Sequence, residues 1–194
     1  MFNVASRVQL FAVAGSAGKN FLFFCISEEI NIMESGMIIG VGFLLFSKNE
    51  LGEPCVFTVE ELVGKPSISK EAGMISFPLE TFQKQDMSEI GTIFRLLEEE
   101  VGVHPHFVDI CKVSPEKFSL IPGRQDIVTV YGYGTLLGNP GRKFRPKDSD
   151  IRFAGWKTLN ELLVCRIRVE TTPIIRHFYV NHFKELLNQL SVAA

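Results

Sequence analysis

The sequence predicts a single α/β domain, and two observations lead to this fold class. Short apolar runs rich in β-branched and aromatic residues, typical of strands, stand on both sides of one strongly amphipathic helical segment, 87–101. The 194 residues are 46% hydrophobic and 22% charged, a composition that suits one globular domain with a substantial core. The net charge of −2 gives no general attraction for nucleic acid or an acidic membrane.

Residues 1–35 are predicted to form a strand extension in front of the main domain, 36–194. Val8–Ala14 and Phe21–Ile26 are apolar and aromatic-rich, and a turn-forming Gly-Ser-Ala-Gly-Lys-Asn lies between them. We therefore expect a hairpin that packs on the domain. The glycines and the lysine of this turn lack the spacing of a phosphate-binding loop.

A second hairpin opens the main domain. Met37–Ser47 is a nearly continuous apolar run, as expected for a strand covered on both faces, and it is too short to span a bilayer as a helix. We therefore expect no membrane partner. After a turn, Cys55–Val59 returns as the paired strand, and Ala72–Phe77 is the strand that leads to the helical segment.

The helical segment is expected to run from about Met87 to Val101. Asp86 can cap it, with Glu89 completing a capping box, and Gly102 provides a stop. At about 100° per residue, one apolar side should face the core, with Glu99 opposite and Glu100 on the flank. That apolar side consists of Ile90, Ile93, Phe94, Leu97 and Val101.

Three successive glutamates, Glu98, Glu99 and Glu100, close this helix at its C-terminal end. The helix dipole is negative there and favours cations, so each exposed carboxylate costs up to about 1 kcal/mol. A solvated acidic surface is one interpretation of this misfit. A functional site is the other.

More strands and a final helix follow. Phe107–Val113 and Asp126–Leu137 have strand composition, and the second should be a central strand. A loop rich in basic residues and proline, 139–150, precedes the strand Ile151–Trp156. The amphipathic stretch Thr172–Leu190 is expected to end the chain as a helix.

The string from Arg95 to Val103 resembles the second half of the Nudix box, Arg-Glu-U-x-Glu-Glu-x-Gly-U, where U is a bulky aliphatic residue. Leu96 departs from this pattern, which has a glutamate there. Leu79-Glu80 also departs from it, since two glycines of the family's Phe-Pro-Gly-Gly stand there. The positions that match are Arg95, Leu97, Glu99, Glu100, Gly102 and Val103.

The order of elements is also similar to this family over about Gly36–Asn188, and Trp156, Leu159 and Leu162 resemble its Trp-x-x-Leu-x-x-Leu segment. The resemblance implies a Nudix-like α/β/α sandwich with a mixed β-sheet. It also implies hydrolysis of a diphosphate linkage in a small-molecule nucleoside diphosphate derivative.

The resemblance implies that Glu99 and Glu100 hold Mg²⁺ or Mn²⁺, because hard divalent cations bind carboxylate oxygens and substrate phosphates. Arg95 lies one turn before Glu99, where an ion pair can orient the carboxylate. The residues expected at the substrate are Arg124, Arg142 and Asp150. For each of these residues an ordinary exposed charge or polar loop is the alternative interpretation.

Two other functional interpretations stay open. Because Leu96 and Leu79-Glu80 depart from the pattern, the chain can be a catalytically inactive Nudix-fold module that binds a nucleotide or a protein. It can also be an unrelated α/β domain with an acidic helix. The scattered cysteines predict buried free thiols in a reducing cytoplasmic environment, and the sequence leaves a homodimer open.

Overall fold

The computed structural model describes four stretches of the chain, residues 9–12, 22–25, 36–138 and 144–192. The chain divides into two compact units, Met1–Met37 and Ile38–Ala194. In the first unit, β1 (Gln9–Ala12) pairs antiparallel with β2 (Leu22–Cys25), so the two apolar runs are paired strands as expected. The packing of this extension on the main domain stays a prediction.

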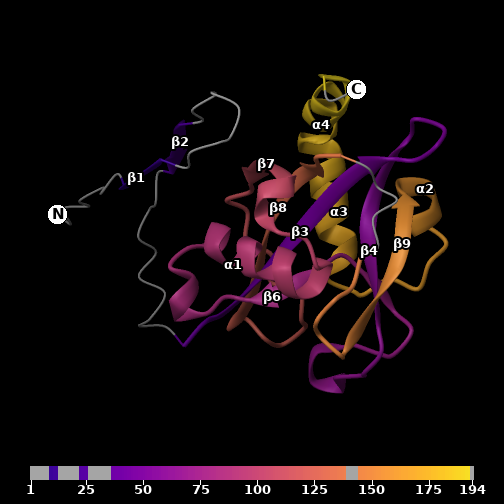
Figure 1. Cartoon of the computed structure of the whole chain (residues 1–194). Coiled ribbons are helices and arrows are strands. Elements are labelled where there is room, and N and C mark those ends of the chain that lie inside the picture. Colours follow the sequence, from indigo (N-terminus) through magenta and orange to yellow (C-terminus); the bar gives the residue numbers. More distant parts are fainter. Residues whose placement is uncertain (1–8, 13–21, 26–35, 139–143, 193–194) are drawn as a thin grey trace. The chain divides into compact units, whose positions relative to one another are not determined.

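The second unit is built on a seven-stranded mixed sheet (Figure 1). The strand order is β5-β4-β3-β8-β7, with β6 paired to β3 and β9 paired to β4. The β3–β8 pair is parallel and the other pairs are antiparallel. The strands are β3 (Ile38–Lys48), β4 (Pro54–Glu61), β5 (Ile75–Ser76), β6 (Leu79–Thr81), β7 (Val108–Val113), β8 (Ile127–Leu136) and β9 (Ile151–Thr158).

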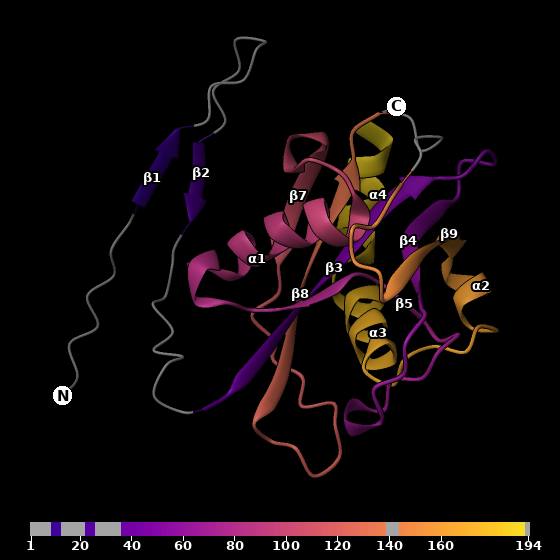
Figure 2. The same cartoon turned by 60° about the horizontal axis from the view of Figure 1, so that its bottom comes forward.

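Helices cover both faces of this sheet, which confirms the α/β/α sandwich. Figure 2 shows α1 on one face and α3 and α4 on the other. The α-helices are α1 (Glu89–Leu96), α2 (Leu159–Leu162), α3 (Thr171–Asn181) and α4 (Phe183–Val192). Short 3₁₀ turns lie at Pro66–Ile68, Lys84–Asp86 and Pro105–Phe107, and a π-helical turn at Leu97–Val101 continues α1.

The two faces are packed differently. On the α3 face, the ring of Phe178 stacks on Phe46 at 4.9 Å between centroids and meets Tyr133 edge-on. On the α1 face, a Cβ at Gly132 would lie 2.8 Å from Ile93 Cδ1, so the glycine in β8 lets the helix approach the sheet closely.

The helix α1 begins later than the sequence predicts. Ser88 is its N-cap, with Ser88 Oγ accepting from Gly91 N at 3.2 Å. Met87 has a left-handed backbone with φ of 60° and cannot continue a helix. The prediction that Asp86 caps this helix is therefore wrong. The prediction that Phe94 faces the core is also wrong, since Phe94 is 44% exposed.

The terminal helix is two helices instead of one. The chain bends at His182, where α3 ends and α4 begins. The ring of His182 stacks on Tyr133 at 5.4 Å, so a tertiary contact interrupts the helical pattern there. The strand expected at Ala72–Phe77 is shortened to β5, because Gly73 has a left-handed backbone.

None of the helices in the described part of the chain has the length and apolar character needed to cross a bilayer. Cys55, Cys111 and Cys165 are free thiols, as expected, but of these three only Cys55 is buried.

Candidate functional site

The acidic end of the helix is the π-helical turn Leu97–Val101, which ends at Gly102 with φ of 74°. Such turns are rare and are frequent at functional sites. A Cβ at Gly102 would lie 2.6 Å from Arg145 O, so glycine lets the loop before β9 pack against the helix end. In this loop, Lys147 N donates to Glu99 O at 2.6 Å. The loop is thereby fixed beside the glutamates.

The three glutamates of this turn lie in three different environments. Glu98 is exposed and lies 3.9 Å from the ring of His104. Glu99 has a half-exposed side chain. Glu100 is only 6% exposed, and its Oε2 accepts from Leu79 N at 2.8 Å. The pair predicted to hold metal is therefore split between one open and one buried carboxylate.

Arg95 is held by Asp86, a buried aspartate in the 3₁₀ turn that precedes the helix. Arg95 Nε and one terminal nitrogen donate to the two oxygens of Asp86, both at 2.9 Å, and that terminal nitrogen also donates to Thr81 O at 2.7 Å. Asp86 accepts further bonds from Gln83 N and Thr92 Oγ1. The hydrogen bonds from Arg95 hold the pKa of Asp86 below its usual value.

The remaining nitrogen of Arg95 links two carboxylates. It lies 3.2 Å from Glu80 Oε2 and 3.5 Å from Glu99 Oε2, the predicted partner one turn along the helix. Asp86 and Thr81 O bind the other nitrogens of this guanidinium, so both carboxylates contact one group whose position is set by hydrogen bonds.

These two carboxylates line an open pocket of about 260 Å³ together with Lys147 and Asp148. We call it the acidic pocket. Its walls therefore carry three carboxylates and one amine. The strand β6, the helix end and the loop before β9 each contribute to it.

The donors of the acidic pocket fit a hard divalent cation in chemistry, because their ligand atoms are carboxylate oxygens. Within the described ranges, no three His, Cys, Asp or Glu side chains are grouped closely enough to hold a metal ion. Mg²⁺ usually binds one or two protein carboxylates together with waters and substrate phosphates. The pocket therefore fits a metal that arrives with an anionic substrate better than a metal held by protein alone.

Leu96, which departs from the Nudix pattern, and Glu100, which matches it, are both buried. Leu96 is fully buried, so the helix presents no carboxylate or other side chain to solvent at this position. Burial raises the pKa of Glu100 to about 8, with smaller contributions from the charges of Glu80, Asp148 and Glu61, against the bond from Leu79 N.

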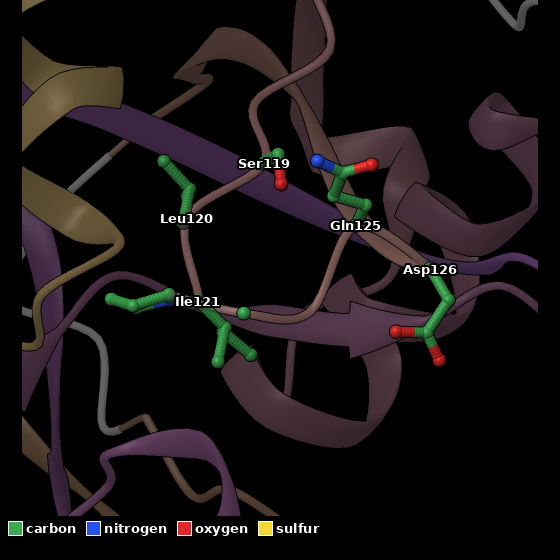
Figure 3. Close-up of a pocket in the computed structure, with 7 residues that line it drawn as sticks. Ser119, Leu120, Ile121, Gln125 and Asp126 are labelled. Atoms are coloured by element: carbon green, nitrogen blue, oxygen red, sulfur yellow. The ribbon is translucent and has the colours of Figure 1, made fainter.

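The residues predicted to bind substrate lie elsewhere. Arg124 pairs with exposed Asp126 at 2.8 Å, and Asp150 Oδ2 lies 3.4 Å from Lys65 Nζ. Neither lines the acidic pocket. Arg142 lies outside the described residues. The loop 119–126, to which Arg124 belongs, curves around a separate hollow, as Figure 3 shows. This hollow has a volume of about 610 Å³ and is lined by Ser119, Leu120, Ile121, Pro122, Gly123, Gln125 and Asp126.

A second group of charges is closed to solvent. Glu61, at the end of β4, contacts Lys70 Nζ and accepts from Arg168 at 2.7 Å, and Arg168 also contacts Glu170. All four residues are at most 6% exposed. We call this group, with two acids and two bases, the closed cluster.

Sequence reasoning did not single out Glu80 as a residue of the acidic pocket, and it considered Lys147 only as one of four basic loop residues that could meet a substrate phosphate. The signal for Glu80 was that a charged residue stands where the Nudix pattern has a glycine. Lys147 was one of several basic residues in its loop, and only the bond to Glu99 O distinguishes it.

The fold is similar to solved Nudix structures. The NUDIX domain of Shewanella oneidensis NrtR complexed with ADP ribose is 16% identical, with 72% of this chain and 84% of that chain covered and a TM-score of 0.56. A C. elegans Ap4A hydrolase binary complex is 13% identical, with 74% of this chain and 96% of that chain covered and a TM-score of 0.57. A NUDIX hydrolase from Nitrosomonas europaea is 16% identical, with 91% of this chain and 88% of that chain covered and a TM-score of 0.54.

No family model matches the sequence, and no curated protein matches it. At these identities the likeness establishes the architecture: the chain has the Nudix fold. This is the architecture that the resemblance of the sequence implies.

Proposed function

We propose that this chain is a Nudix-fold hydrolase that uses Mg²⁺ or Mn²⁺ to cleave a diphosphate linkage in a nucleoside diphosphate derivative. The observation that carries the proposal is the acidic pocket, with its three carboxylates and one amine. Local helix physics disfavours an acid such as Glu99 at the C-terminal end of a helix. A function that requires negative charge accounts for its presence.

The negative charge of the pocket supports the binding of a metal ion together with the diphosphate. A diphosphate alone would be repelled by three carboxylates, whereas a divalent cation between them attracts both. Such a cation would polarise the phosphoryl group and stabilise negative charge as the bond breaks. Lys147, on the rim of the pocket, would contact a phosphate oxygen.

Glu99 is the main candidate ligand in this proposal. Glu100 is a second candidate through Oε1, since Oε2 accepts from Leu79 N. Arg95 acts by orienting Glu99 and Glu80. A pocket carboxylate would orient or deprotonate the attacking water, as general bases do in hydrolysis.

The substrate class is supported by the similar structures, which include a domain complexed with ADP ribose and an Ap4A hydrolase. Both compounds contain phosphoanhydride bonds next to a nucleoside. The proposal also keeps the cytoplasmic location, which the free thiols support. The homodimer stays a prediction.

The buried Leu96 favours a second candidate function, a Nudix-fold module that binds such a nucleotide without cleaving it. The loss of a carboxylate at this position removes one metal ligand of the Nudix pattern. Glu99 and its neighbours would then orient a ligand that stays intact.

Turnover of a nucleotide panel separates these two functions. The panel includes ADP-ribose and Ap4A at millimolar Mg²⁺, and release of phosphate or nucleoside monophosphate is measured. We expect metal-dependent release that falls about 100-fold or more in Glu99→Gln, because a metal ligand is lost. The matched control Glu98→Gln, one residue away and outside the pocket, should keep full activity. Nucleotide binding without any release would favour the module.

A further inference from the structure

The helix presents no carboxylate at Leu96, so a metal in the acidic pocket lacks one protein ligand of the Nudix pattern. Leu96 is fully buried in the core between α1 and the sheet. Restoring the pattern with Leu96→Glu would place an unpaired carboxylate in this core and would test stability more than catalysis. A carboxylate on another element that borders the pocket can take the place of this ligand.

Glu80 lies on β6, one of the elements that border the acidic pocket. Its backbone is fixed because β6 pairs antiparallel with β3, with Glu80 opposite Val41. The preceding residue is also fixed, since Leu79 N donates to Glu100 Oε2 at 2.8 Å. The two residues that replace the glycines of the Nudix pattern thus do different things: Leu79 holds one carboxylate inside the protein, and Glu80 adds another at the pocket.

The side chain of Glu80 is oriented as well. Glu80 Oε1 accepts from Thr81 N at 2.8 Å, and Oε2 lies 3.2 Å from Arg95. The same Arg95 nitrogen contacts Glu99 Oε2, so these two carboxylates lie on the same rim. The side chain of Glu80 is 22% exposed, which leaves it accessible from the pocket.

We infer that Glu80 is a metal ligand of this site and replaces the carboxylate that the helix lacks at Leu96. This inference rests on the proposed function. A metal ligand on β6 in place of one on the helix accounts for two departures from the Nudix pattern together, Leu96 on the helix and Glu80 on β6. A divalent cation held by Glu80 and Glu99 would lie beside Asp148 and Lys147, where the phosphates of the substrate complete its coordination.

Metal affinity, measured without turnover, tests this inference. The probe is Mn²⁺ with α,β-methylene-ADP, a diphosphate whose bridge cannot be hydrolysed, and free Mn²⁺ is followed by its EPR signal. We expect Glu80→Gln to weaken Mn²⁺ binding about tenfold or more, because an oxygen ligand loses its charge. Glu98→Gln makes the same charge change outside the pocket and should bind Mn²⁺ as the wild type does. If Glu80→Gln does not fold, Glu80→Asp keeps the charge with a shorter reach and should also bind Mn²⁺ more weakly.

Two results would overturn the inference, and only the second would also overturn the proposed function. If Mn²⁺ binding is unchanged by substitution of Glu80 but is lost in Glu99→Gln, then Glu80 is not a ligand and the proposed function stands. If the wild type takes up no Mn²⁺ at millimolar concentration even with the analogue, the proposed function and the role of Glu80 both fail.

Discussion

The closed cluster and the acidic pocket are made from the same kinds of side chain, but they differ in balance and access. The closed cluster pairs two acids with two bases at 6% exposure or less. The acidic pocket has three carboxylates against one lysine on its walls, and it is open. The comparison teaches that balanced charge inside the fold is structural, whereas an excess of negative charge at an opening, which Arg95 and Lys147 offset only in part, is available to a ligand.

Because of this difference, substitutions in the two groups should affect different properties, namely protein stability and metal binding. Removing one member of a buried ion pair leaves a charge in a poorly solvated place, and that is costly. Exposed pairs contribute little to stability, because water screens them. Substitutions in the closed cluster should therefore change the free energy of unfolding, and substitutions in the acidic pocket should change metal affinity.

The largest expected effect is on stability, in Arg168→Met. Glu61 and Glu170 would both lose a buried cationic partner, so the free energy of unfolding should fall by about 3–5 kcal/mol. Urea unfolding measures this change. Arg152→Met is the matched control, since Arg152 pairs with Glu60 in an exposed position, and it should cost less than about 1 kcal/mol. Equal losses in the two variants would contradict the distinction between buried and exposed charge pairs.

An effect on stability that depends on pH is expected in Glu100→Gln, because charges of both the acidic pocket and the closed cluster act on Glu100. Glu100 is buried, and its pKa is raised from an ordinary value of 4.5 to about 8, partly by the charges of Glu80, Asp148 and Glu61. The folded state therefore keeps a proton that the unfolded state releases between these pH values. Wild-type stability should fall as pH rises through this window, by up to about 1.4 kcal/mol per pH unit.

Glutamine does not titrate, so Glu100→Gln should gain stability relative to the wild type from pH 4.5 to 8 and show little difference below that range. Urea unfolding at a series of pH values, without divalent metal, checks this. Parallel curves for the two proteins would mean that Glu100 is not desolvated in the folded state.

The smallest effect on stability is expected in Asp148→Asn. Asp148 is exposed, so the free energy of unfolding should change by less than about 0.5 kcal/mol. Mn²⁺ affinity should nevertheless fall several-fold, since the pocket loses a negative charge. Asp150→Asn is the control, because Asp150 belongs to the same loop but pairs with Lys65 and does not line the pocket. Equal Mn²⁺ affinities in the two variants would remove Asp148 from the site.

The architecture was largely predictable from the sequence, because it depends on local patterns. The continuous apolar run gives β3, the turn after it gives the β3–β4 hairpin, and Trp156 with Leu159 and Leu162 marks β9 and α2. Gly102 ends the helix as expected, since its backbone is left-handed.

The composition of the site was less predictable, because it depends on contacts between distant segments. A regular helix places Glu100 on the flank, but the π-helical turn and the bond from Leu79 N bury it. Asp86 looked like a helix cap and is instead the partner of Arg95, nine residues along the chain. Lys147 reaches the site through a backbone bond that the sequence does not indicate.

The most direct test of the central claim is an anomalous difference map from crystals grown with Mn²⁺ and α,β-methylene-ADP. The account predicts a Mn²⁺ peak in the acidic pocket, within coordination distance of Glu80 and Glu99 and of the phosphates of the analogue. A nucleotide bound without Mn²⁺ in this pocket, or Mn²⁺ bound only elsewhere on the chain, would contradict it.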